Sequence, residues 1–125
     1  MSFRKEKKYS FPNKSLFNFV KYLYDQGIKK VHNDRIINSL YFDNNILSMH
    51  HDSEEGVLPR KKIRIRWYND ENIFNKEVKI SSVEGRYKFI EEKLNEDSFN
   101  SIKNLNFFDQ IYGYLNSKLL VTYER

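Results

Sequence analysis

The residues whose chemistry stands out in this sequence lie between Arg60 and Tyr68, in the run RKKIRIRWY. Successive side chains of a β-strand point to opposite faces, so residues two apart share a face. A strand here would carry on one face Arg60, Lys62, Arg64, Arg66 and Tyr68, and on the other Lys61, Ile63, Ile65 and Trp67. Like charges in a row repel one another unless an anion or an acid lies against them. The row therefore predicts a surface that binds something rich in negative charge, and the alternative is a solvated edge strand whose charges prevent aggregation.

A second strand is expected beside this basic row. The segment Ile73–Ile80 follows a polar, turn-like stretch and places apolar residues on one face, as the second strand of a hairpin does. Its polar face includes Glu77 and Lys79. Antiparallel pairing would place these two side chains beside Arg64 and Arg66, where Glu77 is expected to orient an arginine through an ion pair.

The segments before the basic row are interpreted from their periodicity. Phe3–Phe11 alternates and is predicted to be a strand. A helix is predicted from Pro12 to about Gln26, with Gly27 as its C-cap and an apolar stripe in the core. Arg35–Asp43 is predicted to be a strand, and a polar, irregular segment follows it.

The segments after the hairpin are expected to complete a sheet backed by helices. Ser81–Lys88 is expected to be a loop, because it contains Gly85. Asp97–Asn104 and Phe107–Leu115 are predicted to be helices, and Leu119–Tyr123 a short strand. The predicted fold class is α+β, in which an antiparallel sheet turns its apolar face to helices and its charged face to a common concave surface.

The composition limits the functions that the chain can have. With 125 residues it is long enough for one domain with a modest core. Its 22 Lys and Arg against 17 Asp and Glu give a net charge of +5, which permits an anionic partner such as nucleic acid, a membrane surface or a phosphate polymer. The absence of Cys excludes disulfides, Cys-ligated zinc and thiol catalysis. No apolar run spans a bilayer and no signal peptide is recognisable, so a cytoplasmic location is expected.

Five segments occur in an order and at spacings seen in a known family. They are RKEKKY at residues 4–9, NSLYFD at 38–43, KIRIRWY at 62–68, EVK at 77–79 and VTYER at 121–125. On these segments the sequence resembles the VTC domain, the polyphosphate polymerase domain of the vacuolar transporter chaperone type. This domain belongs to the larger group of triphosphate tunnel, or CYTH-like, enzymes. The resemblance runs from about Phe3 to Arg125, so residues 1–125 are predicted to be one VTC-like domain.

The resemblance implies a fold, an activity and a set of site residues. The family fold is a closed antiparallel β-barrel, or tunnel, whose basic lumen holds a chain of phosphates. Polymerases of the family transfer the terminal phosphate of a nucleoside triphosphate to polyphosphate, assisted by Mn²⁺ or Mg²⁺. The resemblance implies catalytic roles for Lys8, Arg64 and Arg66. It implies a wider set of phosphate ligands, namely Lys8, Lys62, Arg64, Arg66, Lys79, Lys88 and Arg125.

Two departures from the family pattern concern the metal and the extent of the barrel. The tunnel signature has two alternate glutamates before the lysine, and Arg4 stands where the first is expected, which leaves Glu6. Glu6 and Glu77 are therefore expected to be weak metal ligands. The family continues with further strands beyond the closing segment, so the chain is expected to correspond to the N-terminal half of a tunnel. Its unfinished sheet edge is expected to favour self-association.

Three functions remain open at this stage. The first is binding of nucleoside triphosphate or polyphosphate, with phosphoryl transfer if further strands complete the tunnel and weak or no activity in this chain alone. The second is a non-catalytic module that binds polyphosphate or inositol phosphates. The third is a nucleic-acid-binding sheet, which is disfavoured because the aromatic residues alternate mostly onto the apolar face, away from the arginines.

Overall fold

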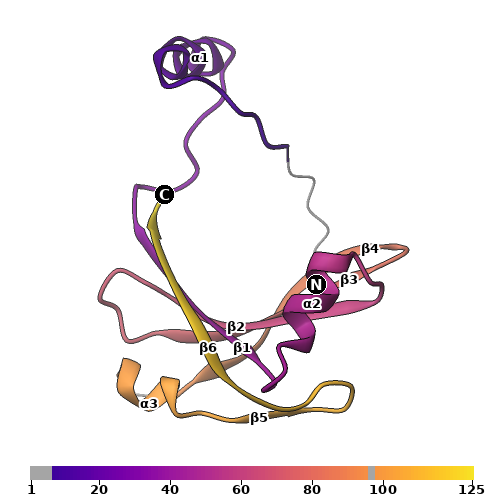
Figure 1. Ribbon diagram of the computed structural model, residues 1–125. Helices are drawn as coiled ribbons and strands as arrows, with labels where there is room; N and C mark the ends of the chain where they lie inside the picture. The colour runs from indigo at the N-terminus through magenta and orange to yellow at the C-terminus, as the bar shows by residue number, and fades with distance from the viewer. Residues whose placement is uncertain (1–6, 96–97) are drawn as a thin grey trace. The chain divides into compact units, whose positions relative to one another are not determined.

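The computed structural model describes residues 7–95 and 98–125, which belong to two units. Residues 7–34 lie in the first unit, which contains the helix α1 (Asn13–Asp25). The second unit begins at Arg35, contains the strands and is called the sheet unit below (Figure 1). In the described part of the chain, no helix has both the length and the apolar character needed to cross a lipid bilayer.

Helix α1 confirms the predicted helix but not the predicted burial of its stripe. It begins after Pro12, and Gly27 follows its C-cap with a φ of +86°, a conformation that glycine adopts without strain. Leu16 and Phe17 of the stripe are 50% and 78% exposed, and no residue of α1 is buried. Within its own unit the stripe is therefore not buried, and the expectation that it forms part of the core stays a prediction. Residues 7–34 contain a single helix, so no second helix of this unit can cover the apolar stripe of α1.

The residues before α1 correct one prediction. Residues 7–11 lie in neither a helix nor a strand, so the predicted strand Phe3–Phe11 is wrong over these positions, and its first residues lie outside the described ranges. The alternating aromatic residues pack locally instead of joining a ladder. The Phe11 ring stacks on the Phe19 ring of α1, with 4.1 Å between the ring centroids. The centroid of the Tyr9 ring lies 6.0 Å from that of Phe19.

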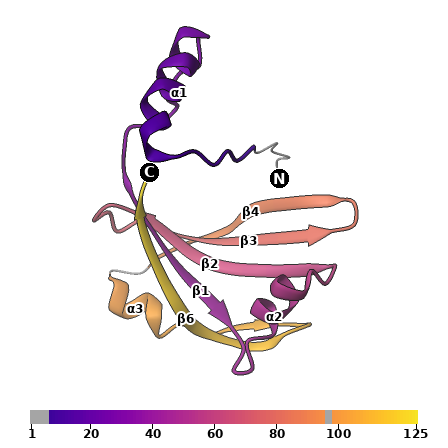
Figure 2. The ribbon, with the colours of Figure 1, turned by 45° about the horizontal axis from the view of Figure 1, so that its top comes forward.

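The described residues of the sheet unit form a six-stranded sheet in the order β4-β3-β2-β1-β6-β5, and every neighbouring pair is antiparallel. The strands are β1 (Ile36–Asp43), β2 (Arg60–Tyr68), β3 (Phe74–Ser82), β4 (Gly85–Leu94), β5 (Phe107–Asp109) and β6 (Gly113–Glu124). Helices α2 (Ser48–Glu55) and α3 (Phe99–Lys103) connect β1 to β2 and β4 to β5. Figures 1 and 2 show that the sheet is strongly curled and forms a half-barrel. The predicted α+β class and partial barrel are confirmed to this extent.

One face of the sheet forms the core, as the alternation in β2 predicted. Ile63, Ile65 and Trp67 are buried in a single apolar cluster with Met49 of α2 and Ile102 of α3. The aromatic rings in this cluster meet edge to face, with Trp67 5.3 Å from Phe74 and Phe42 4.9 Å from Phe107. Met49 and Ile102 thus extend the core beyond the sheet, and the other face of β2 carries its charged side chains.

Two predictions about the segments after the hairpin are wrong. Ser81–Lys88 is not a loop, because β4 begins at Gly85 and pairs with β3 directly after a tight turn, which places Lys88 in a strand. Phe107–Leu115 is not a helix but contains β5 and the start of β6. The Asp109 side chain closes the turn between them, since its Oδ1 accepts hydrogen bonds from the backbone N–H groups of Ile111 and Tyr112. The strand predicted at Leu119–Tyr123 is confirmed as part of the longer β6.

Candidate anion-binding site

The strand register brings basic residues of three strands to one face of the sheet. Lys62 and Arg64 of β2 lie opposite Lys79 and Glu77 of β3, and Lys79 lies opposite Lys88 of β4. Partners in an antiparallel ladder place their side chains on the same face. We call this surface the basic face and define it by Arg60, Lys62, Arg64, Arg66, Glu77, Lys79, Arg86 and Lys88.

The pairing agrees with the predicted hairpin except in one detail. Glu77 lies beside Arg64 and Arg66 as expected, but Lys79 lies opposite Lys62, nearer the other end of β2.

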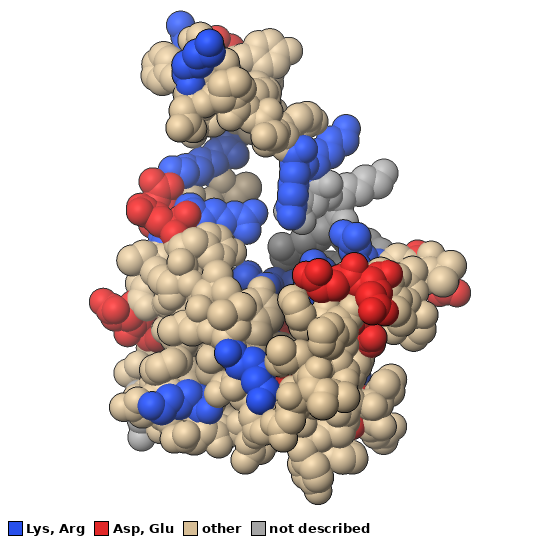
Figure 3. Space-filling model, in the orientation of Figure 1, with Lys and Arg blue, Asp and Glu red and all other residues tan. Residues whose placement is uncertain are grey.

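The charged side chains are not spread evenly over the surface of the sheet unit. The side turned to the viewer in Figure 3, over β6, carries mostly uncharged side chains and only isolated basic ones.

Glu77 is the centre of the basic face and contacts three cations. Its side chain is almost fully buried, and its Oε2 accepts a hydrogen bond of 2.7 Å from Arg64 Nε. Arg66 Nε lies 3.9 Å from the same oxygen, and Lys88 Nζ lies 3.4 Å from Oε1. Burial alone would raise the pKa of Glu77, but Arg64, Lys88 and Arg66 outweigh it and lower the pKa. The carboxylate is therefore charged, and three cations share its one negative charge.

The two arginines are held in place by residues of β1. Arg64 Nη1 donates to the Tyr41 hydroxyl at 3.3 Å, and Arg66 Nε donates to Ser39 Oγ at 3.0 Å. Burial works against the charge of Arg64, but Glu77 and Tyr41 together raise its pKa. Both guanidinium groups are thus oriented within the protein itself. A planar guanidinium offers several fixed donors, which suit phosphate and carboxylate oxygens.

The basic face continues into a small polar hollow at one end. The hollow has a volume of about 190 Å³ and is lined by Arg60, Lys61, Lys62, Lys79, Ser81 and Arg86. Lys62 and Lys79 lie directly opposite each other in the ladder, so two positive charges come together at this end of the face. Nearby Lys88 has a lowered pKa, because burial and the charges of Arg64 and Arg66 outweigh the opposing effect of Glu77.

Arg86 is a member of the face that sequence reasoning missed. It lies two residues before Lys88 in β4, and the same alternation that identified the row in β2 would have found it. The misinterpretation of residues 81–88 as a loop removed that signal. Lys62, Arg64, Arg66, Lys79 and Lys88 are the predicted ligands that the structure brings together.

Of the three remaining predicted site residues, Arg125 is the one with a described position in the sheet unit. Arg125 follows β6, and its backbone exchanges hydrogen bonds with the backbone of Arg35. This position lies past Val121, the residue of β6 that pairs with Ser39, which is also the partner of Arg66. Lys8 belongs to the unit of residues 7–34, so its predicted place in the lumen stays a prediction. Glu6 lies outside the described residues.

The described residues do not fit a divalent metal ion on their own. Residues 7–95 and 98–125 contain no group of three or more His, Cys, Asp or Glu placed to hold a metal. Both oxygens of Glu77 contact cationic side chains. Mg²⁺ and Mn²⁺ require several oxygen ligands, which Glu77 alone does not supply. The metal requirement therefore stays a prediction from the family.

Fold and site together define the class of this protein, an α+β half-barrel with a basic, arginine-lined face. The sequence matches the VTC domain over residues 3–119, which is nearly the whole chain. The chain belongs to the VTC domain family, a family related to polyphosphate polymerases. No curated protein and no solved structure gives a significant match to the chain.

Proposed function

We propose that the basic face binds the phosphates of a nucleoside triphosphate or a polyphosphate. The observation that carries this proposal is the sharing of one buried carboxylate, Glu77, among Arg64, Arg66 and Lys88. The centre of the face remains positive after its internal acid is counted, and a bound anion would complete the balance. The alternative of a charged edge strand does not fit, because β2 is paired on both sides by β1 and β3.

The shape of the row favours a linear anion over a single phosphate. Residues rise by about 3.3 Å each along a strand, so the span from Lys62 to Arg66 is roughly 13 Å. This length matches a chain of several phosphates lying along β2. Arg64 and Arg66 serve as bidentate ligands at the centre, and Lys62 and Lys79 add mobile charge toward the end.

Catalysis is a separate matter from binding. Phosphoryl transfer needs in-line positioning of donor and acceptor and cations that stabilise the developing charge. The basic face supplies cations, whereas the described residues supply no metal site. Binding with weak or absent transfer is the activity that we propose for this chain, and the catalytic roles of Lys8, Arg64 and Arg66 stay predictions. The cytoplasmic location also stays a prediction.

Nucleic acid is a less suitable ligand for this face. Single strands bind largely by stacking bases on exposed aromatic rings. Trp67 and Phe74 are buried in the core, and the Tyr68 ring is covered by the Arg35 guanidinium at 3.9 Å. Tyr41 lines a hollow beside the face and does not form a row of stacking rings along the cations. A non-catalytic module for inositol phosphates would use the same contacts, but the linear row favours a linear ligand.

A competition experiment tests the binding proposal. Fluorescently labelled tripolyphosphate is bound to the purified chain at fixed salt and is then displaced by unlabelled polyphosphate, inositol hexakisphosphate or single-stranded RNA at equal phosphate concentration. Polyphosphate is expected to displace the label most effectively. Stronger displacement by RNA would indicate a nucleic-acid module, stronger displacement by the inositol phosphate a sensor, and absence of tripolyphosphate binding would overturn the proposal.

Activity is tested separately by incubating the chain with ATP and Mn²⁺ and separating the products on a gel. We expect no growing polyphosphate ladder. A ladder that disappears in the variant Lys8→Ala would show instead that this chain is catalytic.

A further inference from the structure

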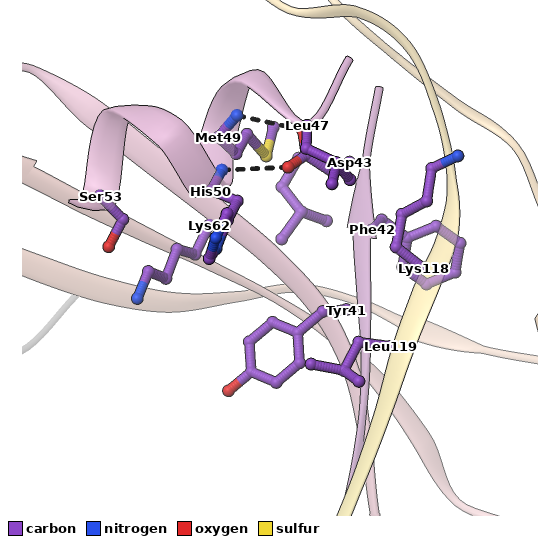
Figure 4. A pocket seen from close by; sticks show the side chains of 11 residues that line it. Tyr41, Phe42, Asp43, Leu47, Met49, His50, Ser53, Lys62, Lys118 and Leu119 are labelled. Carbon is purple, nitrogen blue, oxygen red and sulfur yellow. Dashed lines mark hydrogen bonds between the residues drawn. The ribbon is translucent and has the colours of Figure 1, made fainter. Parts of the chain in front are cut away.

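A second hollow adjoins the basic face and has a different chemical character. Its volume is about 410 Å³, within the range of about 300–1,000 Å³ that is usual for small-molecule pockets. Figure 4 shows that α2 forms one wall and that Tyr41 of β1 and Leu119 of β6 form the other. Apolar side chains, among them Met49 and Leu119, make up much of the lining, whereas the smaller hollow beyond Lys62 is lined by polar residues alone.

The wall formed by α2 is fixed to the sheet. The buried side chain of Asp43, at the end of β1, accepts hydrogen bonds of 3.0 Å from the backbone N–H groups of both Met49 and His50 (Figure 4). Met49 itself is buried in the core. The first turn of α2 is therefore anchored by hydrogen bonds and by packing, which fixes this wall of the hollow.

The opposite wall depends on an irregularity between β1 and β6. Tyr41 pairs with Leu119, but the next residue, Phe42, pairs with Ser117, so Lys118 has no partner in β1. Such a bulge changes the direction of side chains locally. As a result, both Lys118 and Leu119 line the hollow, an apolar side chain next to a basic one.

Two residues connect this hollow to the basic face. Lys62 lines both hollows, and Tyr41 lines the larger one while its hydroxyl accepts a hydrogen bond from Arg64. The apolar wall thus lies beside the row of cations, next to Lys62 and Arg64. An inorganic phosphate chain gains nothing from Leu119 and Met49, whereas a molecule with phosphates at one end and a flat, weakly polar group at the other uses both surfaces.

We infer that the larger hollow holds the nucleoside end of a nucleoside triphosphate whose phosphates lie on the basic face. This inference rests on the proposed function and adds a specificity site to it. The base packs against Leu119 and Tyr41, opposite α2, and Lys62 lies at the junction between the base and the phosphates. Leu119 and Tyr41 distinguish a nucleotide from an inorganic polyphosphate.

The test compares ATP with inorganic tripolyphosphate, which shares its three phosphates but has no nucleoside. Calorimetric titrations use the wild-type chain, the variant Leu119→Trp, whose larger side chain fills the hollow, and the control Leu120→Trp. Leu119 and Leu120 are neighbours in β6 and are similarly exposed, at 58% and 44%, but only Leu119 lines the hollow. Each variant is compared with wild type for the same ligand, so the different charges of the two ligands cancel.

We expect Leu119→Trp to weaken ATP binding by roughly tenfold or more, the range usual for a changed apolar pocket contact, and tripolyphosphate binding by less than about twofold. Leu120→Trp is expected to change neither. Equal losses for both ligands, or unchanged ATP binding, would overturn the inference and leave the proposed function standing. Unchanged ATP binding together with a change in oligomeric state by light scattering would assign the hollow to a second copy of the chain. A wild-type chain that binds neither ligand would refute the proposed function itself.

Discussion

Two buried carboxylates, Glu77 and Asp109, have opposite relations to the basic residues around them. Asp109 Oδ2 accepts a hydrogen bond of 2.6 Å from Lys61 Nζ, and its Oδ1 accepts from two backbone amides in the β5–β6 turn. Its environment offers one ammonium group for one carboxylate. Glu77 meets the cationic groups of Arg64, Arg66 and Lys88, which carry more positive charge than it can neutralise.

The pKa values of the two acids shift in the same direction for different reasons. Burial works to raise the pKa of each carboxyl. Lys61 and the amides of Ile111 and Tyr112 outweigh it at Asp109, and the three cations outweigh it at Glu77, so both pKa values are lowered. Lys61 and Arg64 belong to the same strand but to opposite faces. A matched pair thus fixes the fold on one side of β2, and an unmatched cluster leaves positive charge for a ligand on the other.

The largest effect is expected when the excess charge is removed. The double variant Arg64→Ala and Arg66→Ala should weaken tripolyphosphate binding by several kcal/mol, at about 1.5–3 for each charged hydrogen bond lost. It also leaves Glu77 buried with fewer partners, so the same pair is made in the Glu77→Gln background to keep the fold intact. The measurement is calorimetric titration of chains whose circular dichroism matches wild type. Lys103→Ala, a charge removed from α3 on the other side of the sheet, is the control, and unchanged affinity in a folded double variant would remove the arginines from the site.

The hairpin that carries this comparison was largely predictable from the sequence. Alternation in β2 separates the arginines from Ile63 and Ile65, because strand period is a local property of the chain. The contact between Glu77 and Arg64 was expected from antiparallel pairing across the short connection of residues 69–73, although the pairing of Lys79 with Lys62 was not.

The misjudged segments failed for identifiable physical reasons. The apolar residues of Phe107–Leu115 recur at a spacing that imitates a helix, while Asp109 and Gly113, with a φ of +80°, form the turn of a hairpin. Periodicity showed that α1 is amphipathic, but it carries no information on what covers a helix. The pocket beside Lys62 was also not predictable, because its walls come from segments far apart in the chain and from a bulge in β6.

The matched pair is tested by Asp109→Asn. This change leaves the partly buried ammonium of Lys61 without an acid and weakens the β5–β6 turn, so we expect a stability loss of about 1–3 kcal/mol. Tripolyphosphate affinity should change little, because Asp109 is not on the basic face. Urea unfolding and calorimetric titration measure the two quantities. A loss of affinity comparable with the loss of stability would contradict the separation of the two faces.

The unmatched cluster is tested by Glu77→Gln. Glutamine keeps the size of the side chain but removes the internal anion that competes with phosphate for Arg64, Arg66 and Lys88. We expect tripolyphosphate to bind roughly three- to tenfold more tightly at low salt, with a smaller gain as salt screens the charges. Weaker binding in a folded variant would show that the carboxylate matters more for orienting Arg64 than for setting the charge.

The dependence of stability on acidic pH tests Glu77 and Asp109 together. Each has a folded-state pKa below its ordinary value of 4.5 for Glu77 and 3.8 for Asp109, so each stabilises the fold above that value and loses its contribution as the pH falls through the folded-state pKa. Wild type is therefore expected to lose stability below about pH 4.5, in urea titrations repeated at successive pH values. The double variant Glu77→Gln and Asp109→Asn should lose less over the same interval. Parallel curves for the two chains would mean that other carboxylates govern acid unfolding.

The smallest effect concerns the open edge of β6. The unmatched groups there are backbone N–H and C=O groups, whereas those of the basic face are charged side chains. In the described chain, β6 pairs with β1 along most of its length, but β5 covers its other edge only at residues 113–115. Leu119, Leu120 and Tyr123 are exposed along this stretch. Open strand edges recruit other chains, so we expect weak, concentration-dependent self-association in light scattering. Leu120→Lys should reduce it by placing charge at the edge, without changing tripolyphosphate affinity, and a wild-type chain that stays monomeric at high concentration would contradict this expectation.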